Sequence, residues 1–125
     1  MRQAHEVIEQ AAQLGANLII AAGFLLGDTV KKYASRLVAS HWKDFDPKMG
    51  DPAYAKHGFH GDFVELGKGV VDFHGLADFY RQIGFDGWVQ LELDRTREAS
   101  IAISAQKMKA FVTDQLKLQM VPVSH

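Results

Sequence analysis

Cysteine does not occur in this chain of 125 residues, and proline is nearly as scarce, with three residues. Without cysteine there can be no disulfide, no thiolate metal ligand and no cysteine nucleophile, so a reducing compartment, the cytoplasm, is the predicted setting. Long apolar runs are missing too, since none approaches the roughly 18 residues of a membrane span. The polar N-terminal stretch is unlike a signal peptide. We therefore expect a cytoplasmic protein with no membrane partner.

Neither sign of charge dominates the chain. Fourteen Lys and Arg residues face fifteen Asp and Glu residues, which leaves a formal net charge of −1. A protein that binds nucleic acid needs a basic field to hold the phosphate backbone, so nucleic acid is not an expected partner. Hydrophobic residues make up 47% of the chain and charged residues 23%, as in ordinary globular domains, and the length suffices for one domain with a core.

Hydrophobic spacing predicts helices that alternate with short apolar strands. The strands are expected to be buried, which favours a parallel sheet covered by helices. A Gly-, Pro-, His- and Asp-rich segment over 45–68 is expected to be a long loop, and Gly67-Lys68-Gly69 predicts a tight turn rather than a phosphate cradle. The last helix should bury Ile101, Ala105, Met108, Val112 and Leu116. Helices are predicted over 4–14, 28–36, 76–83 and 99–117. The second begins at Asp28, and the third has Asp72 near its N-cap and Gly84 as its stop. Strands are predicted over 16–24, 37–41 and 87–94.

Polar side chains stand where two of these strands end. His41 ends the strand over 37–41, while Glu92 and Asp94 end the strand over 87–94. The carboxyl ends of parallel strands meet at one edge of a sheet, so we expect His41 and Glu92 to converge there, beneath the 45–68 loop.

Two interpretations of these residues stay open. An imidazole with carboxylates suits a divalent cation such as Mn, Co, Zn or Mg, but a histidine at a strand end can also be a hydrogen-bonded structural residue. Glu92 would face water on a one-sided sheet, whereas in a sheet buried on both faces its carboxylate would need a partner. Lys43 can pair with Asp44 or Asp46 at the surface, or contact a hydroxylated or anionic substrate.

The ordered motifs over 28–118 carry a family resemblance. A strand ending in "HWKD", then "ELGKGVVDF", a helix, "GFDGW" and a strand ending in Glu resemble the C-terminal part of the sugar phosphate isomerase/epimerase family. This xylose-isomerase-like TIM-barrel group also includes inosose dehydratase, ketose 3-epimerases and, more remotely, AP endonucleases of the endonuclease IV type. Gly61 and Phe63 stand where that endonuclease branch has Asp and His, which argues against DNA repair.

The resemblance implies a sugar or polyol substrate and a divalent metal (Mn, Co, Mg or Zn) at the top of a barrel. His41 and Glu92 match metal ligands, and Glu92 also matches the residue that moves the proton beside the substrate carbonyl. Lys43 and Asp44 match positions near the substrate. The first Glu and the Asp ligand of the family have no counterpart in this sequence, so the metal is expected to bind weakly.

Length sets the expected architecture. A (β/α)8 barrel takes about 250 residues, so the resemblance implies an α/β fold forming a partial TIM barrel over 1–125, with 1–24 similar to an earlier barrel unit and about three parallel strands in all. Open sheet edges would favour self-association. The expected activity is that of a metal-using sugar isomerase, epimerase or keto-inositol dehydratase; the alternative is a catalytically inactive remnant or a small binding domain of the same fold.

Overall fold

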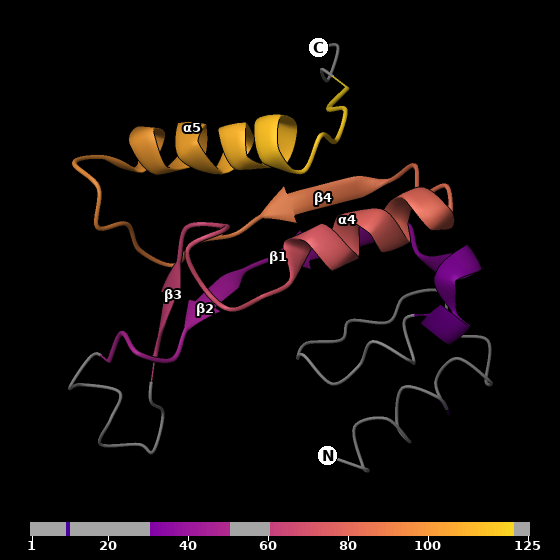
Figure 1. Cartoon of the computed structure of the whole chain (residues 1–125), viewed down its shortest axis with the longest axis horizontal. Coiled ribbons are helices and arrows are strands. Elements are labelled where there is room, and N and C mark those ends of the chain that lie inside the picture. The colour runs from indigo at the N-terminus through magenta and orange to yellow at the C-terminus, as the bar shows by residue number, and fades with distance from the viewer. Residues whose placement is uncertain (1–9, 11–30, 51–60, 122–125) are drawn as a thin grey trace. The chain divides into compact units, whose positions relative to one another are not determined.

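The computed structural model describes residues 10, 31–50 and 61–121 (Figure 1). Its contacts divide the chain into two units, Met1–Leu37 and Val38–His125. The predicted helix over 4–14 and the strand over 16–24 lie outside the described residues. In the first unit, the predicted helix from Asp28 is described from residue 31 onward, where Lys31 and Lys32 are helical and a 3-10 turn, η2 (Ala34–Arg36), follows.

A parallel pair of strands is the centre of the second unit. β1 (Ala39–Trp42) runs beside β4 (Trp88–Leu91), with Ala39 opposite Trp88 and Trp42 opposite Leu91. Figure 1 shows the two strands side by side, although residues 43–87 separate them in the chain. The predicted strands and their parallel pairing are therefore confirmed, with bounds that differ by a few residues.

The prediction that these strands are buried is wrong. Residues along β1 and β4 alternate between exposed and half-buried, and only Trp42, at 1% exposure, is part of the core. Trp88 on β4 is 69% exposed. A continuous apolar run does not distinguish a strand covered on both faces from one covered on a single face, and packing decides between them.

A second, antiparallel pair lies within the segment predicted as a loop. β2 (Asp44–Asp46) pairs with β3 (Asp62–Val64), and Phe45 stands opposite Phe63. Their rings meet edge to face with centroids 5.7 Å apart. Residues 51–60, within the same predicted loop, lie outside the described part. The prediction of one long loop over 45–68 is therefore corrected, because 45–46 and 62–64 belong to short strands.

The helix α4 (Phe73–Gln82) confirms the prediction around residues 76–83. Asp72 caps it by accepting a hydrogen bond from the Gly75 backbone N–H, and Gly84 follows with φ of 61°, the left-handed conformation that glycine tolerates at a helix end. The buried face consists of Phe73, Ala77 and Tyr80. Trp42 packs against two of these, 5.3 Å from Phe73 and 5.6 Å from Tyr80 between ring centroids, so α4 covers β1.

The last helix differs from its prediction in the face that it buries. α5 (Ile101–Ala110) begins at the cap residue Ser100 and continues into a π-helical turn, η3 (Phe111–Gln115). Met108, Val112 and Leu116 are buried as expected, but Ile101 is 68% exposed and Ala105 is also exposed. Ser104 is buried in their place, because its hydroxyl donates a hydrogen bond to the carboxylate of Glu65.

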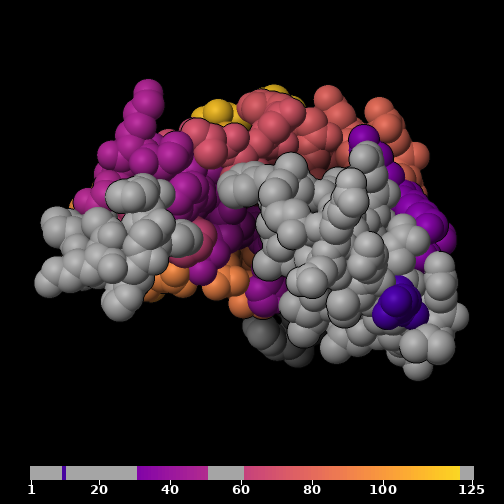
Figure 2. Space-filling model, turned by 90° about the horizontal axis from the view of Figure 1, so that it is seen from below, coloured from indigo at the N-terminus to yellow at the C-terminus, as the bar shows by residue number. Residues whose placement is uncertain are grey.

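Aromatic contacts join the two helices. Phe73 of α4 meets Phe111 of η3 at 6.1 Å, and the Arg81 guanidinium donates to the backbone carbonyl of Leu116. Figure 2 shows α4 in salmon and the end of the α5 segment in yellow along one margin of the molecule. The described fold is therefore mixed α/β, with two α-helices, a parallel pair and an antiparallel pair. Among the described residues no helix has the length and apolarity to cross a membrane.

Candidate functional site

Two side chains that are 51 residues apart in the sequence meet at the carboxyl ends of β1 and β4. The backbone N–H of Glu92 donates to the carbonyl of Trp42, which extends the pairing by one residue past β4. That register brings Nδ1 of His41 to 3.1 Å from Oε2 of Glu92. The predicted convergence of His41 and Glu92 is confirmed.

Lys43 joins the same cluster. Its Nζ atom donates to Oε1 of Glu92 at 3.1 Å and to Oδ1 of Asp94 at 2.8 Å. It also lies 3.9 Å from the centre of the Phe63 ring, a distance at which the ring face attracts a cation. Of the two interpretations left open for Lys43, the structure does not show the pairing with Asp44 or Asp46, and contact with a substrate stays a prediction. We call His41, Lys43, Glu92 and Asp94 the strand-end cluster.

The charges in the strand-end cluster stabilise one another. Hydrogen bonds from His41 and then from Lys43 hold the pKa of Glu92 below its ordinary value of 4.5. Burial lowers the pKa of Lys43, but the hydrogen bonds to Asp94 and Glu92 outweigh burial and leave that pKa above 10.5. At neutral pH the cluster therefore contains an ammonium between two carboxylates, next to an imidazole whose side chain is 61% exposed.

A divalent metal suits this cluster in donor chemistry but not in the number of ligands. An imidazole nitrogen and a carboxylate oxygen are ordinary ligands for Mn, Co, Zn or Mg. Within 31–50 and 61–121, however, no three His, Cys, Asp or Glu side chains are grouped so that they could hold an ion. Lys43 also places a positive charge beside the Glu92 carboxylate. These residues alone do not fit a complete metal centre, and the expected metal stays a prediction.

Asp44, which the family resemblance matches to a position near the substrate, is surrounded by backbone N–H groups. Its side chain is fully buried, and its two carboxylate oxygens accept four backbone N–H groups. Oδ1 accepts from Phe45 at 2.9 Å and Val71 at 3.1 Å, and Oδ2 accepts from Gly67 and Gly69 at 2.9 Å each. Asp44 therefore anchors the loop over 65–71 to β2. The structure gives it a structural role.

The Gly67-Lys68-Gly69 turn is built around this internal anion. Gly67 has φ of 85°, in the left-handed region, and a side-chain carbon at Gly69 would collide with the Asp44 carboxylate. The predicted tight turn is confirmed. Successive backbone N–H groups of this kind form a nest for an anion, and here the nest holds a carboxylate of the chain itself.

A second polar cluster surrounds Glu65, the first residue of the 65–71 loop. The carboxylate of Glu65 is buried and accepts from Ser104 Oγ at 2.8 Å and from Thr96 Oγ1 at 3.3 Å. Burial raises the pKa of Glu65, but these bonds together with its own backbone N–H and the charge of Lys68 leave that pKa below 4.5. Lys68 connects Glu65 to Glu98, at 3.5 Å and 3.1 Å.

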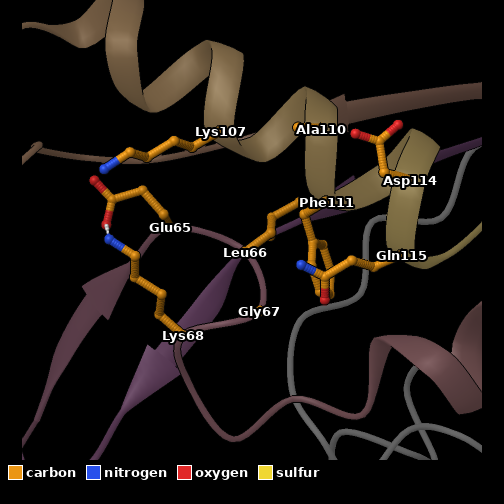
Figure 3. Close-up of a pocket in the computed structure, with 9 residues that line it drawn as sticks. All are labelled: Glu65, Leu66, Gly67, Lys68, Lys107, Ala110, Phe111, Asp114 and Gln115. Carbon is orange, nitrogen blue, oxygen red and sulfur yellow. Dashed lines mark hydrogen bonds and ion pairs between the residues drawn. The ribbon is translucent and has the colours of Figure 1, made fainter.

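Beside that cluster is a cavity of about 300 Å³ (Figure 3). In Figure 3, Lys68 and Lys107 point toward Glu65 from two sides, and Asp114 stands at the other end of the cavity. Both lysines already have a carboxylate partner in Glu98. The volume is at the lower end of the range of ligand sites, and both lysines that line it are already paired with carboxylates. The cavity therefore ranks below the strand-end cluster as a functional site.

A third ion-pair group was not found from the sequence. One carboxylate oxygen of the buried Asp62 on β3 accepts from both Arg95 and Arg97, at 2.6 Å each. Asp46 lies directly opposite Asp62 in the ladder, so the two arginines also offset a like-charge pair across the strands. This group holds the segment after Asp94 against β3. The alternation of charges in "DRTRE" was the only available signal.

Two comparisons of the sequence with known proteins found no relative. No protein-family model matches the chain, and a search of curated proteins found no match. The resemblance to the sugar isomerases therefore stays a prediction, and the candidate site depends on its own contacts.

Proposed function

We propose that the strand-end cluster binds a sugar or polyol, and that the chain acts on it as an isomerase, an epimerase or a keto-inositol dehydratase. The observation that carries the proposal is the contact of His41 with Glu92 at the shared carboxyl end of two parallel strands. In folds of parallel strands connected by helices, that end is where substrates bind. Two paired parallel strands with α4 between them in the chain are also what neighbouring units of a partial TIM barrel would contribute.

In the proposed reaction, Glu92 moves a proton. Its carboxylate is ionised at neutral pH and partly exposed, so it can take the proton from the carbon next to a substrate carbonyl. Returning the proton to the former carbonyl carbon, while the hydroxyl proton of the first carbon passes to the former carbonyl oxygen, gives an isomer. Delivery of a proton by a second acid to the opposite face of the first carbon gives an epimer. Negative charge develops on the carbonyl oxygen when the proton leaves. Among the described residues, Lys43 is the cation beside Glu92 that can donate a hydrogen bond to that oxygen.

A second function is favoured by one feature of the same cluster. A carboxylate whose pKa is lowered by two hydrogen bonds is a weaker proton acceptor, because the ideal general base has a pKa near the working pH. A domain that binds sugars or polyols without turning them over would need the hydrogen-bonding groups of the cluster but not a strong base. Binding without turnover is therefore the alternative.

One experiment separates the two functions. The protein is incubated in D2O with a panel of aldoses, ketoses, their phosphates and keto-inositols, with and without Mn²⁺, and proton NMR follows deuterium entering the carbon next to the carbonyl. The proposal predicts exchange that Glu92→Gln abolishes and that Asp46→Asn, a control on β2, retains. Binding without exchange would establish the alternative. Neither binding nor exchange with any member of the panel would refute both.

A further inference from the structure

The ammonium of Lys43 contacts the same carboxylate that would have to bind a metal ion at this site. Glu92 uses both carboxylate oxygens within the cluster: Oε2 faces His41 and Oε1 faces Lys43. A divalent ion that bound the imidazole and this carboxylate would sit about 2.0–2.2 Å from its ligand atoms. The ammonium is 3.1 Å from the same carboxylate. Two cations would then share one carboxylate at close range, and each would weaken the binding of the other.

Three groups from two segments hold that ammonium in place. Glu92 and Asp94 accept its hydrogen bonds from the end of β4, and Phe63 on β3 presents its ring face. The side chain is only 24% exposed, so the ammonium is less screened by water than a surface lysine. A lysine fixed in this way places a positive charge directly beside both carboxylates and offsets one of their two negative charges.

We propose that Lys43 is the resident cation of the strand-end cluster, so that the folded chain excludes divalent metals from His41 and Glu92 as long as this ammonium is present. The inference concerns the site used in the proposed function, but it requires no turnover. It disagrees with the metal that the sequence resemblance implies. A ligand that binds here would meet an ammonium and an imidazole rather than a metal-bound water.

Removing the charge of Lys43 tests this inference. The full chain and Lys43→Gln are titrated with Co²⁺, whose visible absorption reports nitrogen and oxygen ligation, and calorimetry with Mn²⁺ gives affinities. We expect no saturable binding by the unmodified chain at millimolar metal and at least about a tenfold gain in Lys43→Gln, since the competing cation is gone and the carboxylates are freed. His41→Ala added to Lys43→Gln should remove that gain.

Two controls keep the outcome specific. Lys68 also lies between two carboxylates, Glu65 and Glu98. Among the described residues, the Glu92 carboxylate at Lys43 also contacts an imidazole, whereas no ion pair joins a histidine to Glu65 or Glu98. Lys68→Gln should therefore bind metal no better than the unmodified chain. Lys43→Arg retains the charge and should also exclude metal. Micromolar binding of Co²⁺ or Mn²⁺ by the unmodified chain would overturn the inference, even if Lys43→Gln fails to fold. A folded Lys43→Gln without any gain would overturn it too. Neither result depends on whether the deuterium-exchange experiment finds activity.

Discussion

Replacing Asp44 with asparagine tests how much of the fold depends on one buried carboxylate. The two oxygens of Asp44 divide their four backbone partners evenly, with Phe45 and Val71 on Oδ1 and Gly67 and Gly69 on Oδ2. Asparagine keeps one oxygen and replaces the other with an NH2 group, which is a donor. Whichever way the amide turns, two backbone N–H groups then face a donor and lose their acceptor.

The expected loss follows from these contacts. A fully buried donor left without a partner costs about 1–3 kcal/mol, and because the donors here are part-buried, the two together cost at most about 2–6 kcal/mol. A domain of this size is stable by only about 5–15 kcal/mol. We therefore expect Asp44→Asn to lose a large part of its free energy of unfolding. Asp44→Ala, which leaves all four donors without a carboxylate, should be mostly unfolded.

Urea denaturation followed by circular dichroism measures this loss, and hydrogen exchange locates it. The amides of Gly67 and Gly69 should exchange faster in Asp44→Asn than the amides of α4. Asp46→Asn is the matched control, because Asp46 lies on the same strand but, among the described residues, its side chain accepts a single hydrogen bond, from the Lys48 backbone, through an oxygen that asparagine retains. It should cost less than about 1 kcal/mol. If the two variants lost the same small amount, the structural role assigned to Asp44 would be refuted.

Three other predictions concern backbone space, charge and association. Gly69→Ala should lower the Tm by about 5–15 °C, because its added carbon collides with a buried carboxylate, whereas Gly50→Ala, in open space, should not; equal Tm values by calorimetry would contradict this. The ion pair of Glu92 and Lys43 should stabilise the fold fully between pH 4.5 and 10.5. Its contribution should fade below 4.5 as the carboxylate protonates and above 10.5 as the ammonium deprotonates. If urea titrations showed that the free energy of unfolding falls above pH 10.5 as much in Lys43→Gln as in the unmodified chain, this prediction would fail. Open strand edges should make the chain self-associate, and Trp88, exposed on β4, should contribute, so Trp88→Lys should shift light scattering toward monomer; a monomeric parent chain at micromolar concentration would exclude this.

Local features of the chain could be predicted where a few neighbouring residues decide the outcome. The start and stop of α4 follow from Asp72 and Gly84. An N-cap side chain accepts a hydrogen bond from a backbone N–H of the first turn, and a glycine adopts the left-handed conformation that ends the last turn, so both signals act within a few residues. The meeting of His41 with Glu92 was predictable for a related reason. Once two strands are assigned and taken as parallel neighbours, their carboxyl ends must share an edge, and the residues at those ends meet.

Contacts between distant segments could not be predicted in the same way. Asp44 looked like one more polar residue after a strand, and nothing near it in the sequence indicates that a turn more than twenty residues later wraps its carboxylate. β2 and β3 have three residues each, too few for a recognisable alternation. On α5 the apolar Ile101 faces solvent and the polar Ser104 is buried, because Glu65 needs a hydroxyl partner there.

The sequence by itself determined α4 with its cap and stop, the parallel strands β1 and β4, and the two polar strand ends that form the candidate site. Only the tertiary structure decided which groups those strand ends contact. Lys43 pairs with Glu92 and Asp94 rather than with its neighbour Asp44, and the buried Asp44 carboxylate accepts hydrogen bonds from backbone N–H groups. The physical reason is range. Propensity and capping act within a few residues along the chain, whereas a buried or half-buried charge takes its partner from whatever segment the fold brings close.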